Sequence, residues 1–144
     1  MGFLFSEDGK RVILLEKGHP SWLKGQWIGI GGHLDPGENA LEAMIRESKE
    51  EADLDPLDWQ LVKEQRTFET PGDGNTGAVI SMFIAFGDLS KAKAMTYERI
   101  QEFALEDVPY DKLTEATAAA FGEVAAIAIQ RQNELKQKPK KLKP

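Results

Sequence analysis

Apolar residues along the chain fall into six short runs that turn-forming residues separate. They predict β-strands at residues 2–5, 12–15, 26–30, 59–70, 78–86 and 99–104. Between the first two runs, the Asp8-Gly9 pair is typical of a β-hairpin turn. Between the two longest runs, the glycine-rich residues 71–77 favour a hairpin loop, because strand patterns lie on both sides of them.

Two further segments, residues 40–52 and 113–135, carry apolar residues at helical spacing. Asn39 precedes the first segment and Glu42 lies three residues later, which is the pattern of a capping box at a helix start. The second segment should pack one side on the protein, formed by Leu113, Ala116, Ala120, Val124, Ile127 and Leu135. The order of three strands, a helix, three strands and a helix predicts an α+β fold in which helices sandwich a mixed β-sheet.

Cysteine is absent from the 144 residues, which excludes disulfides, thiolate nucleophiles and Cys-ligated zinc. The length suits one domain, residues 1–135, followed by a Pro- and Lys-rich tail, residues 136–144, that we expect to be disordered. No apolar run approaches the roughly 18 residues that span a membrane. The apolar patch near the N-terminus is too short for a signal peptide. We therefore expect a cytoplasmic protein without a membrane segment.

The net charge of −6 is unevenly distributed, because five lysines lie in the tail and leave the rest of the chain more acidic still. An acidic body does not suit a phosphate-rich polymer, which requires a basic face on the protein. If the ligand is an anion, a divalent cation is the natural bridge between that anion and the acidic protein.

Three glutamates, Glu47, Glu50 and Glu51, share one stripe of the helix at 40–52. The stripe lies beside the arc expected to pack on the sheet, which comprises Leu41, Met44, Ile45, Ser48 and Ala52. Like charges at this spacing repel one another, so an ordinary solvated helix face is the alternative to a binding site. Their place beside the apolar arc, and the glycine pair that leads into the helix, favour the binding site. Carboxylates and backbone carbonyls are the hard oxygen ligands that Mg²⁺ prefers.

The segment from Gly32 to Leu54 resembles the Nudix box, G-x5-E-x7-R-E-U-x-E-E-x-G-U, in which U is a bulky apolar residue. The glycine and charged positions that match in register are Gly32, Glu38, Arg46, Glu47, Glu50 and Glu51. Ser48 replaces an apolar residue of the pattern. Asp53 replaces a glycine, so it should adopt a left-handed conformation at the helix end at a cost of about 1 kcal/mol. The strand order is also similar to that of MutT-like Nudix hydrolases, so the resemblance covers most of residues 1–135.

This resemblance implies an enzyme that uses Mg²⁺, with Mn²⁺ as a substitute, and a water nucleophile. The implied reaction cuts a diphosphate linkage in a nucleoside triphosphate or another nucleoside diphosphate derivative. Its products are a nucleoside monophosphate and pyrophosphate or a phosphorylated leaving group. The implied metal ligands are chiefly Glu50 and Glu51, with Glu47 as a ligand or the general base and the Gly31 carbonyl as a backbone ligand.

The resemblance also implies residues that position these acids. Arg46 is expected to orient the glutamates and to pair with Glu38, while Gly32 shapes the backbone at the start of the box. Family members often add an acid from beyond the box, and Glu98 resembles that residue. An ordinary surface glutamate is the alternative for Glu98, and the general base is either this residue or Glu47.

The substrate-binding residues are less defined by the pattern. Many members that hydrolyse oxidised purine triphosphates read the base with an asparagine before the glycine stretch, where this chain has Ile28, which cannot hydrogen-bond a base. Trp27 is a candidate for stacking on a base, with packing as the alternative. Lys24 and Arg66 are candidates for phosphate contact, with solvated surface as the alternative.

A nucleotide-sensing Nudix-like module that binds without turnover is the main competing hypothesis. Such modules usually lose acids of the box, whereas all three helical glutamates are present here. Chemistry on RNA ends is disfavoured by the acidic body. The expected partner is therefore a small nucleotide-like molecule rather than a nucleic acid or a membrane. A homodimer is expected only by analogy with the family.

Overall fold

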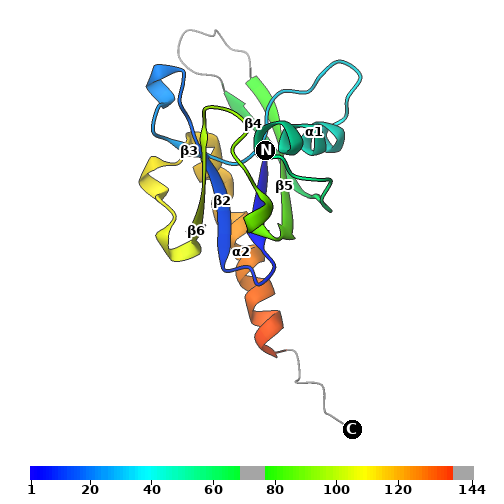
Figure 1. Ribbon diagram of the computed structural model, residues 1–144, viewed down its shortest axis with the longest axis vertical. Helices are drawn as coiled ribbons and strands as arrows, with labels where there is room; N and C mark the ends of the chain where they lie inside the picture. The colour runs from blue at the N-terminus through cyan, green and yellow to red at the C-terminus, as the bar shows by residue number, and fades with distance from the viewer. Residues whose placement is uncertain (69–76, 138–144) are drawn as a thin grey trace.

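The computed structural model describes residues 1–68 and 77–137 (Figure 1). Its strands are β1 (Gly2–Ser6), β2 (Arg11–Glu16), β3 (Trp27–Ile28), β4 (Gln60–Phe68), β5 (Gly77–Gly87) and β6 (Arg99–Ala104). Its two α-helices are α1 (Ala40–Ala52) and α2 (Glu115–Gln137). The element order agrees with the one that the sequence predicts.

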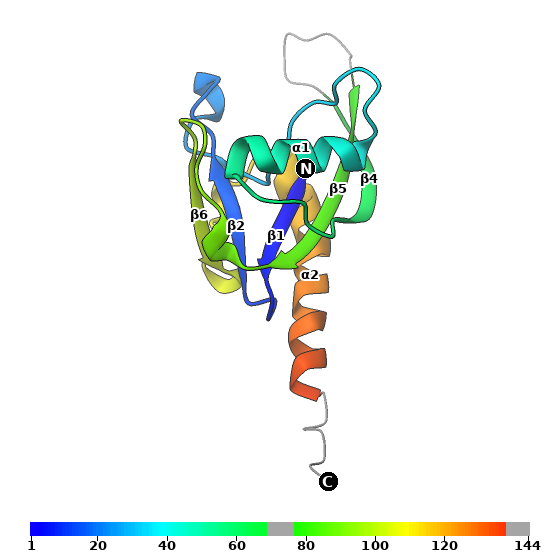
Figure 2. The ribbon, with the colours of Figure 1, turned by 45° about the vertical axis from the view of Figure 1, so that its right-hand side comes forward.

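All six strands belong to one mixed sheet. β1 and β5 run parallel, from Gly2 opposite Phe83 to Ser6 opposite Gly87, and the remaining strand pairs are antiparallel. β4 pairs with β5 on one side of the sheet, and β6 pairs with β2 on the other. α1 crosses one face and α2 lies on the opposite face, so the expected α+β sandwich is confirmed (Figure 2).

Alternating side chains of the strands supply two separate cores. In β1, Phe3 and Phe5 contribute to the core that includes Phe121 of α2, whereas Leu4 contributes to the core that includes Met44 of α1. Phe3 meets Phe121 edge to face, with ring centroids 5.7 Å apart. The sheet is thereby fixed between the two helices, and α1 is held at a defined position on its face.

The apolar side predicted for the second helix is wrong at its ends. α2 begins at Glu115, after Leu113, and continues past Leu135 to Gln137. Leu135 is exposed, because the last turns of α2 extend beyond the sheet and have no strand to pack on (Figure 2). The buried residues are Thr117, Ala120, Phe121, Val124, Ala125 and Ala128.

Other sequence expectations also need correction. Leu41 is exposed rather than packed on the sheet, and the strand expected at 26–30 is limited to Trp27–Ile28. Lys136, expected in a disordered tail, lies in the last turn of α2. The predicted glycine-rich loop falls almost entirely at 69–76, and the rest of the predicted tail at 138–144, outside the described residues. In the described part of the chain, no helix is both long and apolar enough to cross a membrane.

Candidate active site

The start and end of α1 are fixed by local hydrogen bonds. The Asn39 side chain accepts from the Glu42 N–H at 2.8 Å, and the Glu42 carboxylate accepts from the Asn39 N–H at 2.9 Å, which confirms the capping box. At the other end, Asp53 has the left-handed conformation expected of it, with φ 54° and ψ 32°. Lys49 pairs with the Asp53 carboxylate at 2.9 Å. The helix that carries the glutamates therefore has well-defined ends.

Arg46 connects α1 to the loop that precedes it. Its Nε and Nη2 donate to the two oxygens of Glu38 at 2.7 and 2.9 Å, so the pairing of Arg46 with Glu38 is present and bidentate. Nη2 also donates to the His33 carbonyl at 2.9 Å. The Arg46 guanidinium lowers the pKa of Glu38 below its usual value, chiefly through these hydrogen bonds.

The same guanidinium also reaches the acidic stripe. Nη1 of Arg46 donates to Glu47 at 2.8 Å and to Glu50 at 3.1 Å. The Glu50 side chain is 57% exposed, against 15% for Glu47. Arg46 therefore fixes the orientation of Glu47 and Glu50, while Glu51 lies outside its reach.

Glu51 is held on the inner side of α1 by the backbone. Its Oε1 accepts a hydrogen bond from the Gly31 N–H at 2.9 Å. Burial raises the pKa of Glu51 to about 7, the Gly31 hydrogen bond opposes this effect, and the negative charges of Glu47 and Glu98 add to it. Two carboxylates from different parts of the chain thus oppose the ionisation of Glu51.

Gly32 leaves the room that Glu47 needs. A Cβ atom at this position would lie 2.6 Å from Glu47 Oε1 and 2.9 Å from Oε2, closer than real Cβ contacts come. Any side chain at position 32 would therefore push the Glu47 carboxylate away. This steric requirement explains why the first position of the box is a glycine.

Glu98 reaches the site from the segment before β6. Its side chain is only 9% exposed, so it is not an ordinary surface glutamate. Lys17 Nζ lies 3.4 Å from Glu98 Oε2, within ion-pair range but without hydrogen-bond geometry, so this buried oxygen has no hydrogen-bond partner. Sequence reasoning did not identify Lys17. The contact of Lys17 with Glu98 depends on residues far apart in the sequence, because the β2–β6 register places Glu16 opposite Arg99 and thus Lys17 beside Glu98.

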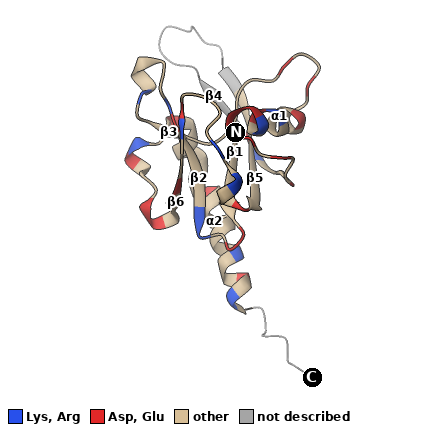
Figure 3. Ribbon diagram, viewed as in Figure 1, with Lys and Arg blue, Asp and Glu red and all other residues tan. Residues whose placement is uncertain are grey.

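A cleft of about 400 Å³ opens between α1, the glycine segment and β5. Lys17, Ile28 and Glu47 are among its lining residues. Figure 3 shows acidic segments on α1 and on the loops that flank it. The cleft therefore joins the acidic stripe to an apolar wall that includes Ile28.

The other substrate-binding candidates lie elsewhere. Trp27 is buried and packs edge to face on Phe103, with centroids 4.9 Å apart, so it forms core and does not line the cleft. Lys24 is exposed beside the short 3-10 helix Ser21–Leu23 and is also not among the lining residues. Arg66 lies in β4, but its side chain is outside the described residues.

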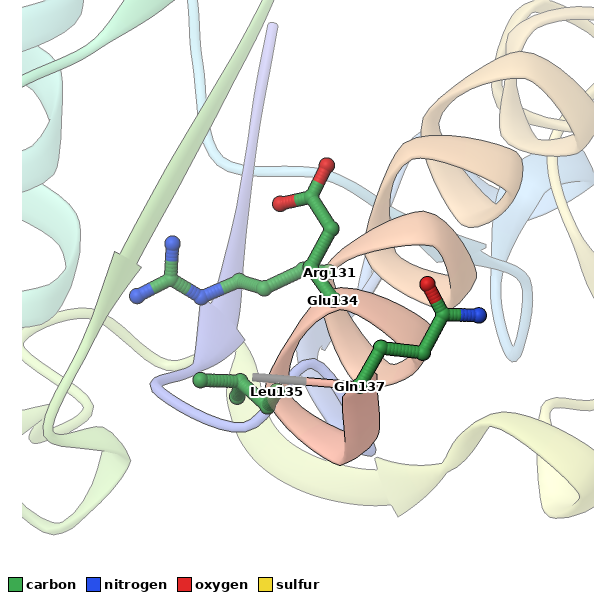
Figure 4. A pocket seen from close by; sticks show the side chains of 4 residues that line it. All are labelled: Arg131, Glu134, Leu135 and Gln137. Atoms are coloured by element: carbon green, nitrogen blue, oxygen red, sulfur yellow. The ribbon is translucent and has the colours of Figure 1, made fainter. Parts of the chain in front are cut away.

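A second hollow of about 500 Å³ lies at the free end of α2 and is lined by Arg131, Glu134, Leu135 and Gln137 (Figure 4). It lies at the C-terminal end of α2, remote from α1 and its acidic stripe (Figure 2). None of the sequence-predicted site residues lines it.

The chemistry of Glu47, Glu51 and Glu98 fits a divalent cation. An unpartnered oxygen of Glu98 is buried, and the charges of Glu47 and Glu98 act on the partly buried Glu51. A cation would give the Glu98 oxygen a partner and would offset the repulsion at Glu51. Carboxylates are suitable ligands for such a cation. Within residues 1–68 and 77–137, no three acidic or histidine side chains are close enough as they stand to hold one ion together.

Comparison with known proteins finds relatives over most of the chain. A family model described as NUDIX domain matches residues 1–129. The chain is similar to the nucleoside triphosphatase NudI of Enterobacter sp. (strain 638), with 32% identity over 105 residues. That alignment covers 67% of this chain and 74% of the relative.

Solved structures resemble the fold. The MutT NUDIX hydrolase from Burkholderia pseudomallei superposes with a TM-score of 0.71 at 23% identity, over 86% of this chain and 98% of the other. A C. elegans Ap4A hydrolase in a binary complex superposes with a TM-score of 0.67 at 20% identity, over 90% of this chain and 93% of the other. At these identities, the structural likeness concerns the arrangement of sheet and helices.

Proposed function

Because the chain belongs to the NUDIX domain family and is a MutT-like Nudix hydrolase, we propose that it cuts a diphosphate linkage in a nucleoside triphosphate or another nucleoside diphosphate derivative. Water is the nucleophile and Mg²⁺, or Mn²⁺ in its place, is the cofactor. The products are a nucleoside monophosphate and pyrophosphate or a phosphorylated leaving group. The nucleoside triphosphatase named among the relatives supports this substrate class.

The observation that carries the proposal is the environment of Glu51. Its carboxylate accepts from the Gly31 N–H while the charges of Glu47 and Glu98 oppose its ionisation. A protein gains nothing in stability from three partly buried acids that repel one another. Such an arrangement is expected where a cation binds, since the cation turns the repulsion into attraction.

We assign the cation to Glu47, Glu50, Glu51 and the Gly31 carbonyl, with Glu98 as the acid from outside the helix. When bound, the metal would neutralise diphosphate oxygens and make a water molecule more acidic. Glu47 and Glu50 would each share their carboxylates between this metal and Arg46, whose Nη1 donates to them at 2.8 and 3.1 Å.

The remaining residues position groups and move a proton. Arg46, which Glu38 holds by two hydrogen bonds, keeps Glu47 turned toward the cleft. Either Glu47 or Glu98 accepts the proton of the attacking water, since both are carboxylates beside Glu51. No covalent nucleophile is needed, because water attacks phosphorus directly.

The cleft wall constrains the base of the substrate. Ile28 lines the cleft and offers only apolar contact, so selection of a base by hydrogen bonding at this position is not expected. Lys24 and Arg66 remain proposed phosphate contacts. We further propose that residues 1–135 form the catalytic domain, with α2 continuing to Gln137 before the basic tail, and that the protein acts in the cytoplasm, as a homodimer by analogy with the family.

A substrate panel tests the activity. The protein is incubated with Mg²⁺ and nucleoside triphosphates, nucleotide sugars, dinucleotides or dinucleoside polyphosphates, and released phosphate and pyrophosphate are measured. We expect turnover of at least one nucleoside triphosphate, and its loss when EDTA removes the metal. Tight binding of one compound with no hydrolysis of any would instead identify a sensing module.

Two substitutions test the residues. Glu51→Gln and Glu50→Gln should each lower kcat steeply while circular dichroism shows an intact fold, because each removes one negative ligand. Glu102→Gln is the matched control, since it removes one carboxylate that pairs with Arg11 on β2, away from the cleft. Wild-type turnover in both helix variants would contradict the assignment.

A further inference from the structure

Backbone hydrogen bonds and an aromatic stack hold the segments that carry Lys17 and Glu98 next to each other. Its N–H donates to the Gln26 carbonyl at 2.7 Å, and its carbonyl accepts from the Gly25 N–H at 3.0 Å. Two residues further, His19 stacks on Tyr97, with ring centroids 4.8 Å apart. This stack joins the segment after β2 to the segment before β6, so the Lys17 and Glu98 backbones keep a fixed relation.

The Lys17 side chain faces acids, and within the described residues its ammonium forms an ion pair with Glu98 alone. The ammonium lies 3.4 Å from Glu98 Oε2, and its positive charge also acts on Glu51. Among the residues that line the cleft in the described part of the chain, Lys17 is the one lysine or arginine. The one lysine or arginine side chain of the described cleft wall therefore lies beside Glu98, a proposed metal ligand.

We propose that Lys17 is an internal counter-ion of this site, which neutralises Glu98 when no divalent cation is bound and moves to a substrate phosphate when one is. The inference rests on the proposed function, because it requires both a divalent cation and a phosphorylated substrate. Lys17 acts on the metal through Glu98 and is in that respect a positioning residue. Its second contact, with phosphate, makes it a substrate-binding residue as well.

The two roles give opposite effects when the charge is removed. The ammonium repels an incoming cation and competes with it for Glu98, so the free protein should bind the cation more tightly without Lys17. The bound substrate, in contrast, loses a charged partner and should bind more weakly. A residue that merely held Glu98 in place would weaken both affinities.

The experiment measures Mn²⁺ binding to the full chain without nucleotide, by electron paramagnetic resonance of the free ion, and steady-state kinetics separately. In Lys17→Met, we expect the Kd for Mn²⁺ to fall roughly tenfold and the KM for the substrate to rise roughly tenfold. Lys17→Arg keeps the positive charge and should retain a Kd close to that of the wild type. An unchanged or raised Kd in Lys17→Met, or an unchanged KM, would overturn the proposal.

Lys63→Met is the matched control. Lys63 pairs with Glu123 of α2 at 2.6 Å, and its side chain is 30% exposed against 24% for Lys17. It lies on the other face of the sheet, so its substitution should change neither constant. If Lys17→Met does not fold, Lys17→Gln is used for the same comparison.

Failure of this inference is distinguishable from failure of the proposed function. Wild-type protein that binds no Mn²⁺ and hydrolyses no member of the panel would contradict the proposed function itself. Wild-type protein that does both, with a Lys17→Met variant that binds Mn²⁺ no more tightly, would contradict only the role of Lys17.

Discussion

Replacement of Glu51 by glutamine should make the metal-free protein more stable and the enzyme inactive. Glutamine has nearly the same shape, and its side-chain oxygen can still accept the Gly31 N–H that Glu51 accepts at 2.9 Å. The substitution therefore removes the negative charge and keeps the hydrogen bond. The difference in stability between the two proteins is therefore the free-energy cost of an ionised carboxylate that is partly buried beside Glu47 and Glu98 in the wild type.

The pKa shift gives the sign and the size of the effect. The pKa of Glu51 rises from 4.5 to about 7 on folding. Because the folded state holds the proton more tightly, its stability decreases as pH rises from 4.5 to about 7, and the whole penalty is present above that range. The shift corresponds to about 3 kcal/mol, which solvent screening of the accessible part of the carboxylate reduces to about 1–2 kcal/mol.

Urea unfolding in EDTA at two pH values measures this difference. At pH near 8, Glu51→Gln should have a free energy of unfolding about 1–2 kcal/mol above that of the wild type. At pH near 4, where both side chains are neutral, the two curves should nearly coincide. Glu102→Gln, which removes an exposed carboxylate far from the cleft, should show no such pH-dependent gain.

Addition of Mg²⁺ should reverse the order of stability at pH 8. The cation binds the folded wild type and raises its free energy of unfolding by mass action, whereas the variant lacks a charged ligand and gains less. A Glu51→Gln protein that is less stable than the wild type in EDTA at pH 8 would refute the view that this carboxylate is held at a cost to the fold.

Three further predictions follow from local geometry. Gly32→Ala should lower kcat at least tenfold with little change in Tm, because a Cβ atom would displace the Glu47 carboxylate; equal kcat values for variant and wild type would contradict this reasoning. Asn39→Ala should cost about 1 kcal/mol in urea unfolding through loss of the helix cap, and Asn39→Asp should restore most of it. Glu38→Gln should make Tm fall less steeply as pH is lowered from 6 to 3. Arg46 lowers the pKa of Glu38, so this contribution to stability is present above the unfolded value of 4.5 and is lost as pH falls through the lower folded value. A calorimetric Tm series between pH 3 and 6 that is identical for variant and wild type would exclude this contribution of Glu38 to stability.

The features that sequence predicted best are those set by neighbouring residues. The capping box at Asn39, the extent of α1 and the left-handed Asp53 each depend on a few adjacent positions. The Arg46–Glu38 pair follows from the spacing of the box and from its resemblance to a known family. These features need no knowledge of how distant segments pack.

The features that sequence missed depend on packing partners. Leu41 and Leu135 fit the helical period, yet both are exposed, because the sheet does not reach the surfaces they occupy. Trp27 lies next to the glycine segment in sequence, but its ring packs in the core against Phe103. The partner of Glu98 was not predictable because Lys17 is distant in sequence and comes beside it only through the register of β2 with β6.

The register of β2 with β6 gives the chain an asymmetric tolerance to changes in length. Side chains alternate between the two faces of a strand, so one residue gained or lost within 99–104 would turn Glu98 to the opposite face and leave Lys17 facing a different neighbour. The connection at 88–96 lies upstream of this pairing, but it is attached to the end of α1, because the Lys93 and Met95 N–H groups donate to the Ala52 and Glu51 carbonyls at 2.9 and 3.2 Å. Insertions and deletions should thus be excluded from the strand, whereas in the connection those that keep these two hydrogen bonds should persist.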